Sequence, residues 1–236
     1  MKKKRAIWTE VIGLNHTDYN VCIHADYGNP FKVHPEREIS MDNVLTKITD
    51  SYLLFQIERV RSFHGYLSTG AFIGIQMLNI AERVLDGDYK EQLYVTCETY
   101  NCLPDPFQIL AGCTIGNKKL KIRDSGKMAV VVNKRAPEDQ MLVRSVRIVL
   151  DPAKTAQYPR LHEWYMKTGK VPHEEAISLL IDAGESVYTY EFMDIELPEK
   201  PEKRIVLCDK CGESFVQKNG GALCLSCIEK IGVLKE

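Results

Sequence analysis

Residues 63–85 read FHGYLSTGAFIGIQMLNIAERVL, and this stretch decides the fold. From Gly70 onward its side chains are apolar on almost every side of a helix. This pattern predicts a helix over 70–86 that is buried on most of its surface. Gly70 and Gly74 are four residues apart, so they would let another backbone approach this helix closely. We therefore expect the helix to lie at the centre of the protein core.

The segments around this helix predict further helices and strands. Residues 40–62 repeat apolar side chains at helical spacing, with Ser40 as an N-cap and Asp42 in the first turn. Further helices are predicted at 104–112, 152–168 and 172–183, and strands at 93–98, 119–123, 127–133, 141–150 and 187–197. Ser125-Gly126 marks a hairpin turn, while residues 1–39 show only weak strand and loop patterns. The expected fold class is α+β, with helices packed on a mixed or antiparallel sheet.

Composition places the chain among ordinary globular proteins. It has 236 residues, of which 44% are hydrophobic and 27% charged, and its formal net charge is −1. This balance gives no general attraction to nucleic acid or anionic lipid, and no run reaches the roughly 18 apolar residues of a membrane span. No secretory signal follows the basic start MKKKR, so we expect a cytoplasmic protein whose cysteines stay reduced.

A charged segment punctuated by prolines, PEKPEK, divides the chain near its C-terminus. It predicts three parts: a core domain over 1–197, a linker over 198–204 and a small zinc-ribbon domain over 205–236.

The small domain carries two CxxC pairs with twelve residues between them, formed by Cys208, Cys211, Cys224 and Cys227. Two intervening residues let both thiolates of a pair reach one ion at about 2.3 Å, and four thiolates favour zinc. Two disulfides or four unrelated thiols are the alternatives, and an intracellular protein makes them weaker. One zinc ion per chain would be structural, because all four ligands come from the protein. Gly212 suits a tight turn, and a hairpin is predicted around Gly220-Gly221.

The turn before the buried helix is a candidate functional site. His64 lies on a glycine turn next to a helix N-terminus, where anions collect and thiol pKa values fall. In the simpler interpretation, Ser68 or Thr69 is the N-cap and His64 is a hydrogen-bonded turn residue. Composition alone favours this simpler interpretation.

A second candidate segment, residues 97–116, contains three cysteines. Cys102 falls in a predicted strand-to-helix turn, Asp105 in the first turn of the next helix, and Cys113 near the end of that helix. Each cysteine alone is weak evidence, because cysteines are often small buried core residues.

Together these segments resemble the E-subunit family of formylmethanofuran dehydrogenase. FHGYLSTG is similar to the FHGHLCPG signature of that family, and ETYNCLPDPFQILAGCTIG followed by KLKIRDSGKMAVVV is similar to its second block. The matching residues of the second block are Cys102, Asp105, Gln108, Gly112, Cys113, Thr114, Gly116, Asp124, Gly126 and Lys127. Members often carry a C-terminal zinc ribbon. The resemblance covers roughly residues 40–150 and 205–230.

The resemblance implies an α+β core, usually dimeric, with a metal or thiol site built from the two segments, and it implies no settled reaction. This chain departs from the signature, because Tyr66 replaces a histidine, Ser68 a cysteine and Thr69 a proline. A serine hydroxyl binds soft metals less well than a thiolate. The candidate catalytic residues are His64 and Cys102, and the candidate ligand-binding residues are Tyr66, Ser68, Asp105 and Cys113. The core would hold a second metal or a small organic ligand.

Three functions compete at this point. The first is a metal-binding protein resembling the formylmethanofuran dehydrogenase E-subunit, with a structural four-cysteine zinc ribbon and a degenerate metal, thiol or small-ligand site in the core. The second is a non-enzymatic zinc-ribbon adaptor, suggested by the changes at Tyr66 and Ser68. The third is nucleic-acid binding through the ribbon, which seven basic against six acidic residues over 199–236 disfavour. We expect a homodimer with a protein partner or a small-molecule ligand. The sequence decides neither the substrate nor whether the protein is an enzyme.

Overall fold

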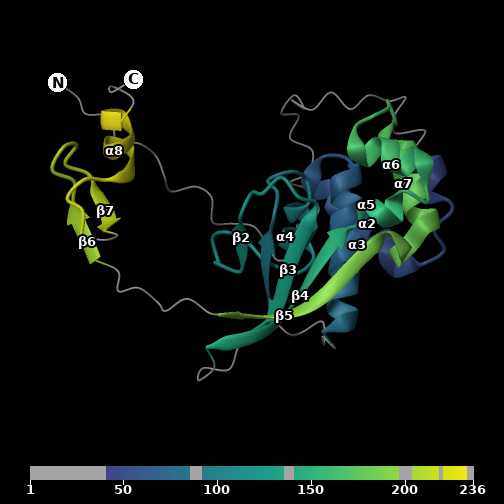
Figure 1. The fold of residues 1–236 in the computed structure, drawn as a ribbon, viewed down its shortest axis with the longest axis horizontal. Coiled ribbons are helices and arrows are strands. Elements are labelled where there is room, and N and C mark those ends of the chain that lie inside the picture. The colour runs from purple at the N-terminus through teal and green to yellow at the C-terminus, as the bar shows by residue number, and fades with distance from the viewer. Residues whose placement is uncertain (1–40, 86–91, 136–140, 197–203, 218–219, 233–236) are drawn as a thin grey trace, which may run out of the picture.

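The computed structural model describes residues 41–85, 92–135, 141–196, 204–217 and 220–232. Over residues 41–196 it shows helices packed against one mixed sheet (Figure 1), so the predicted α+β class is confirmed. The strand order is β2-β1-β3-β4-β5. The strands are β1 (Leu93–Cys97), β2 (Leu120–Ile122), β3 (Ala129–Lys134), β4 (Leu142–Leu150) and β5 (Tyr188–Glu196). The expectations for residues 1–39 lie outside the described residues.

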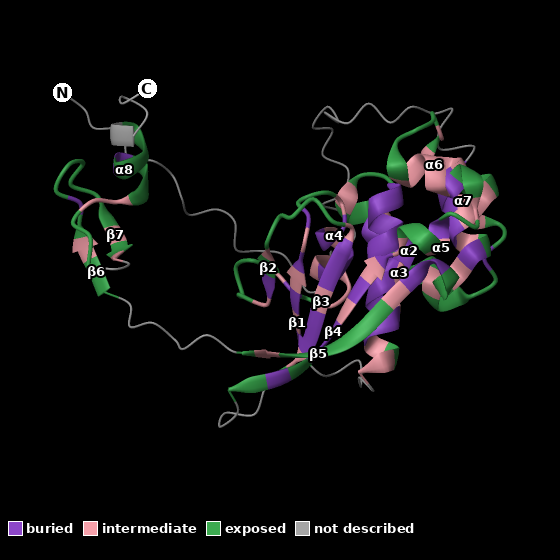
Figure 2. Ribbon diagram, viewed as in Figure 1, coloured by how far each residue is buried: buried purple, intermediate pink, exposed green. Residues whose placement is uncertain are grey.

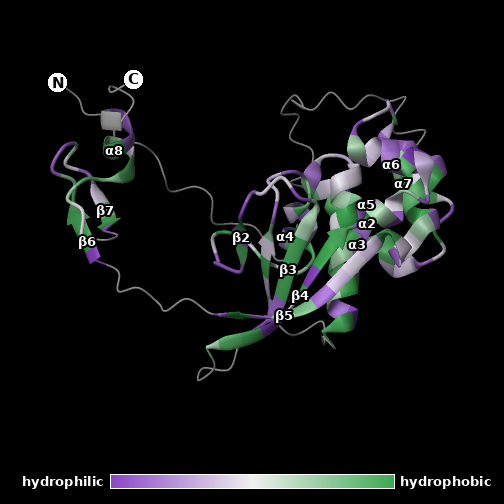
Figure 3. Cartoon of the chain, in the orientation of Figure 1, coloured by the Kyte–Doolittle hydropathy of each residue, from purple (hydrophilic) through white to green (hydrophobic). Residues whose placement is uncertain are grey.

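Helix α3 (Thr69–Val84) lies at the centre of the core, as its sequence predicts. It is buried along most of its length in Figure 2 and strongly apolar in Figure 3. It packs against the sheet at β4, where Val146, Ile148 and Leu150 point to the same face and are fully buried. The apolar run that opened the sequence analysis therefore forms the hydrophobic core.

The two helical glycines of α3 allow the close approach that the sequence predicts. The partner is the segment around α4 (Pro104–Ile109). A Cβ atom placed on Gly74 would lie 2.7 Å from the Leu103 carbonyl oxygen, and one on Gly70 would lie 3.3 Å from the Cys102 Cβ. Because neither glycine has a side chain, α3 and the 102–106 segment come into backbone contact.

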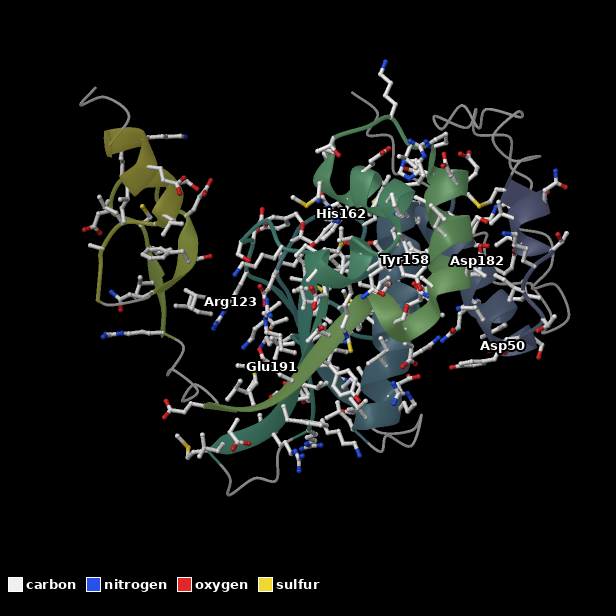
Figure 4. All side chains as sticks on the ribbon, turned by 45° about the vertical axis from the view of Figure 1, so that its right-hand side comes forward. Asp50, Arg123, Tyr158, His162, Asp182 and Glu191 are labelled. Carbon is white, nitrogen blue, oxygen red and sulfur yellow. The ribbon has the colours of Figure 1, made fainter. Side chains whose placement is uncertain are left out.

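The predicted helix over 40–62 is wrong in its extent. Residues 41–45 form a short helical turn, and the chain then begins a separate helix, α2 (Ser51–His64). Asp50, labelled in Figure 4, is the N-cap, and its carboxylate accepts the N–H groups of Tyr52 and Leu53. This cap at Asp50 interrupts the periodicity read from the sequence. Tyr52 and Phe55, two apolar residues of that pattern, are more than half exposed, at 53% and 57%.

The predicted hairpin at Ser125-Gly126 is also wrong, because β2 does not pair with β3. Strand β2 pairs in parallel with β1, and β1 lies between β2 and β3. The turn instead wraps around the end of β1, where the N–H groups of Ser125 and Lys127 both donate to the Glu98 carbonyl. Gly126 has φ +69°, so the turn itself was correctly located.

The predicted helix over 152–168 is two helices, α5 (Pro152–Thr155) and α6 (Pro159–Met166). Pro159 begins the second one, because proline lacks the N–H group that a continuous helix would need there. Helix α7 (His173–Ala183) and the short 3-10 helix η1 (Gly184–Val187) complete this region, and they lead into β5. Lys47 pairs with Asp182 of α7 at 3.3 Å (Figure 4).

Residues 204–232 form a separate small sheet with a helix. Strands β6 (Arg204–Leu207) and β7 (Ser214–Gln217) pair as an antiparallel hairpin, and α8 (Leu225–Gly232) follows. The hairpin turn contains the first cysteine pair, so its predicted place around Gly220-Gly221 is wrong. Gly212 closes the turn with φ +73°. Most of the predicted linker lies outside the described residues, and the three-part division of the chain stays a prediction.

None of the helices in the described ranges has both the length and the apolar character needed to cross a membrane.

Candidate functional site

The turn between α2 and α3 carries the first half of the site. His64 is the last residue of α2, and Gly65 ends that helix with φ +92° and an N–H bond to the Arg61 carbonyl. Ser68 is the N-cap of α3, since its hydroxyl oxygen accepts the Ala71 N–H at 3.1 Å. The two ends of the turn are therefore fixed by helix capping, which holds His64 in place.

The second half of the site comes from the segment that contacts the α3 glycines. Asp105 of α4 accepts a hydrogen bond from His64, with 2.6 Å between the carboxylate Oδ2 and the ring Nδ1. The other carboxylate oxygen of Asp105 accepts the Gln108 amide at 3.1 Å. Cys102 lies in the turn before α4, where His64 and Ser68 interact with its thiol and lower its pKa. The structure thus brings the two predicted segments together, with His64 between a carboxylate and a thiol.

This arrangement favours the charged forms of both His64 and Cys102. The hydrogen bond with Cys102, opposed by partial burial and assisted by Asp105, raises the pKa of His64 to about 9. The hydrogen bond with His64, opposed by burial and assisted by the Ser68 hydroxyl, lowers the pKa of the Cys102 thiol. Each charged form stabilises the other. An imidazolium beside a thiolate is the environment in which a cysteine is nucleophilic.

Two neighbouring cysteines have the opposite character. Burial raises the pKa of Cys97 to about 12 and that of Cys113 to about 11. The Cys113 thiol is fully buried and lies 3.2 Å from the Leu93 carbonyl oxygen. Its hydrogen bonds go to the backbone carbonyls of Leu93 and Ala111 and to none of the other predicted site residues, and it does not line the cleft described next.

A cleft of about 840 Å³ opens above Cys102. Three predicted residues, Tyr66, Ser68 and Cys102, line it. The sequence analysis missed the remaining lining residues, which are Gly70, Thr99, Asn101, Gly126, Met128, Trp164, Tyr165, Lys167, Gly169, Lys170, Val171, Pro172 and His173. More than half of these come from residues 164–173, outside the two segments whose motifs resemble the family signature in the sequence analysis. The aromatic, lysine and histidine residues of this loop are types common in binding sites, but no sequence pattern shows that it lies beside residues 66–70.

Contacts between the two walls fix this loop against the α3 turn. The His173 Nδ1 lies 2.7 Å from the Thr69 hydroxyl oxygen. The Tyr66 ring packs against His64 with 5.0 Å between ring centroids, and against His173 with 6.5 Å. Tyr66 remains 50% exposed, so its ring also faces the open side of the site.

The tail cysteines form a second, different site. The ligand atoms of Cys208, Cys211, Cys224 and Cys227 all lie within 4.8 Å of one another, and this is the only such metal-ligand group among the described residues. The sulfurs of Cys211 and Cys224 are 3.9 Å apart. Four thiolates around one zinc ion would be about 3.8 Å apart, given bonds of about 2.3 Å in a tetrahedron. The residues present therefore fit a metal ion.

Backbone N–H groups donate hydrogen bonds to the carbonyl and the sulfur of Cys208. The first pair lies in the β6–β7 turn, where the Gly212 N–H donates to the Cys208 carbonyl at 2.8 Å. The second pair begins α8, and the Cys224 N–H donates to the Cys208 sulfur at 3.3 Å. This last hydrogen bond also lowers the pKa of the Cys208 thiol, which favours the thiolate that a metal requires.

Comparisons with known proteins agree with the resemblance. A crystal structure of a tungsten formylmethanofuran dehydrogenase E-subunit (FmdE)-like protein from Syntrophus aciditrophicus is similar with a TM-score of 0.63 and 29% identity. The similarity covers 75% of this chain and 92% of that one. A probable S-adenosyl-L-methionine-binding protein of Archaeoglobus fulgidus is 25% identical over 204 residues, or 72% of this chain. The present chain spans about half, 51%, of the length of that curated relative.

The model of one protein family matches most of the core. It is described as FmdE, molybdenum formylmethanofuran dehydrogenase operon, and it matches residues 63–195, from the start of the His64 turn to the last strand of the sheet. The match covers more than half of the chain, and the chain therefore belongs to the FmdE family.

Proposed function

We propose that this protein binds a small molecule in the cleft of its core and acts on it through Cys102, while the tail holds one structural zinc ion. The observation that carries the proposal is the position of His64. It hydrogen bonds Asp105 and also interacts with the thiol of Cys102, a residue that lines the cleft. In this proposal Cys102 is the nucleophile, His64 is its proton acceptor and donor, and Asp105 orients the imidazole ring.

The departures from the family signature fit thiol chemistry better than a core metal. Ser68 takes the place of a signature cysteine, and its hydroxyl hydrogen bonds with Cys102 instead of supplying a second thiolate. Among the described residues, only the tail cysteines bring three or more ligand atoms within 4.8 Å. A second metal in the core therefore stays a prediction. The contacts of Cys102 with His64 and Ser68 support a reactive thiol in the core instead.

The zinc assignment rests on ligand chemistry. Four cysteine sulfurs in two CxxC pairs favour zinc over harder metals, and a closed four-ligand site leaves no position for a substrate. A domain of about thirty residues has little core of its own, so the ion would supply most of its folding energy.

Site-resolved alkylation tests the core proposal. Native protein is treated with iodoacetamide between pH 5 and pH 10, and each cysteine is quantified by peptide mass spectrometry. We expect Cys102 to react with a midpoint below its ordinary pKa of 9, and Cys97 and Cys113 to stay unmodified in the folded protein. Reaction of Cys102 with a midpoint at 9 or above would contradict the proposal. Alkylation of His64→Gln measures the share due to the imidazole.

The name of the Archaeoglobus fulgidus relative suggests one ligand to test, S-adenosyl-L-methionine. Trp164 and Tyr165 in the cleft wall give this candidate a surface on which a planar base can stack. Calorimetric titration with S-adenosyl-L-methionine, and with S-adenosyl-L-homocysteine as the comparison without a sulfonium charge, decides whether the cleft binds it.

Two further predictions remain proposals. A homodimer is expected from the family resemblance, and light scattering of the purified protein measures it. A role for the tail as an adaptor for a protein partner is the alternative function. It gains support only if substitutions at Cys102 and His64 leave every measured activity of the protein unchanged.

A further inference from the structure

We propose that the cleft above Cys102 is built for a small organic anion, a carboxylate or a phosphate, with Lys167 and Lys170 as its counter-charges. This inference rests on the proposed function, because it specifies the class of molecule that reaches Cys102. Two described lysines line the cleft, and none of the described residues that line it is Asp or Glu. The whole chain, by contrast, has 31 basic and 32 acidic residues, so the cleft departs from the average composition.

Lys167 and Lys170 are exposed, and neither forms an ion pair with any residue in the described part of the chain. The backbone of Lys167 has φ +55°, a left-handed conformation that residues other than glycine rarely adopt. Two unpaired cations on one wall attract anions and repel cations. They therefore select the charge of the molecule that enters.

Arg160 pairs with two acidic residues beside this loop and contacts the loop backbone. It donates to Glu163 at 2.6 Å and to both carboxylate oxygens of Glu175, at 2.7 and 2.9 Å. It also donates to the Lys170 carbonyl oxygen at 3.4 Å. Arg160 offsets one of the two negative charges, so these three residues keep one negative charge against the two positive charges of the lysines. Arg160 thus shapes the lysine-bearing wall without lining the cleft.

The groups beside Cys102 do not supply the positive charge of the cleft. Protonated His64 hydrogen bonds with the Asp105 carboxylate, which offsets its charge. The excess positive charge of the cleft therefore comes from the lysine wall. This charge argues against S-adenosyl-L-methionine, whose sulfonium and ammonium groups give it a net positive charge, and in favour of an anion.

Two alkylating reagents of nearly equal size separate charge preference from thiol reactivity. Iodoacetate is an anion and iodoacetamide is neutral. In both, the Cys102 thiolate attacks the CH₂ carbon and iodide leaves. The measurement is the rate constant for iodoacetate divided by the rate constant for iodoacetamide at Cys102. This ratio is then divided by the same ratio for glutathione. A change in the Cys102 pKa alters both rates together, so the ratio reports the charge of the cleft.

We expect a ratio above one for the native protein, falling toward one as salt is added. In the double variant Lys167→Asn, Lys170→Gln it should fall roughly 2- to 30-fold, from the strength of two exposed charge interactions. Asn is chosen because it tolerates the left-handed conformation. Lys121→Gln, on β2 outside the cleft, is the matched control and should leave the ratio unchanged. A native ratio of one, or one insensitive to the double variant, would overturn the inference.

A direct titration tests phosphates and does not need a reactive thiol. Trp164 lines the cleft, and Trp8 is the other tryptophan of the chain, so Trp8→Phe leaves fluorescence from Trp164 alone. We expect adenosine 5′-monophosphate to change this fluorescence at lower concentration than adenosine does. If Cys102 prefers iodoacetate but adenosine 5′-monophosphate does not bind, the cleft is assigned to carboxylates.

The two proposals fail separately. If Cys102 reacts with both reagents at the glutathione ratio and the nucleotide binds no better than the nucleoside, the anion inference fails while the reactive thiol stands. If Cys102 reacts with neither reagent, the reactive thiol fails, and the fluorescence titration still decides the anion inference.

Discussion

The core and the tail use cysteine in opposite ways. In the tail, four thiols converge within 4.8 Å of one another. In the core, Cys102 stands beside a histidine at the edge of an open cleft. Converging thiols suit a metal ion, and a single thiol beside an imidazole suits nucleophilic chemistry. The comparison teaches that the function of a cysteine follows from its neighbours.

Removal of the tail metal should have the largest effect. Structural zinc contributes about 10–16 kcal/mol to folding of small zinc domains, so Cys224→Ser should unfold residues 204–232 and reduce the zinc content from one ion per chain to none. Metal analysis and amide NMR spectra measure both changes. Ser226→Ala, within the second CxxC pair, is the control. If metal removal changed the rate of Cys102 alkylation, the core thiol would depend on a metal, and the contrast between core and tail would be wrong.

Gly74→Ala should have the next largest effect. The added methyl group would lie 2.7 Å from the Leu103 carbonyl oxygen and 2.9 Å from a Pro106 side-chain carbon, so α3 and α4 must separate. We expect a loss of about 1–3 kcal/mol in the free energy of unfolding, measured by urea denaturation, together with slower Cys102 alkylation. Gly116→Ala meets only one atom, at 3.9 Å, and should be near neutral. Unchanged stability of Gly74→Ala would show that the close contact is not needed.

His64→Gln should slow alkylation of Cys102 at pH 7 by about tenfold, since each unit of pKa changes the thiolate fraction about tenfold. Glutamine keeps a hydrogen-bond donor for Asp105 but carries no positive charge. The sign follows from the pKa shifts: His64 is protonated up to about pH 9, and its charge lowers the Cys102 pKa below 9. The difference between native protein and variant should therefore shrink as the pH rises above 9, where the thiol of the variant also ionises. A difference that does not shrink with rising pH would point to a steric effect.

Asp105→Asn should have the smallest effect, because Asp105 acts through His64. Loss of this hydrogen bond should lower the His64 pKa and reduce the alkylation rate at pH 7 by roughly two- to tenfold. Gln108→Met, which removes only the amide that orients Asp105, should reduce the rate less. An effect of Asp105→Asn larger than that of His64→Gln would show that the carboxylate contacts the thiol by another route.

The sequence predicted the parts that depend on local pattern. The apolar run with Gly70 and Gly74 predicted both the buried helix and its close contact, and the CxxC spacing predicted the cysteine cluster. It did not predict the break at Asp50, because a single cap can end a helix inside a periodic pattern. It also missed the parallel pairing of β2, since pairing between strands is a long-range property.

The candidate site likewise has one part that local sequence pattern indicated and one part that depends on long-range contacts. The family resemblance located His64, Cys102 and Asp105, and the structure places His64 between the other two. The wall containing Trp164, Lys170 and His173 was missed, because its contact with the α3 turn joins residues about one hundred positions apart, 104 for Thr69 and His173. Such contacts follow from the packing of α6 and α7, which no local pattern encodes.

The most direct test of the central claim is an NMR titration of the His64 imidazole in the native protein. The account predicts an apparent midpoint of about 9, and a clearly lower midpoint in Cys102→Ser, where the neighbouring thiolate is lost. A midpoint near the ordinary histidine value of 6.5, or one that Cys102→Ser leaves unchanged, would contradict the claim that His64 and Cys102 form a charged pair.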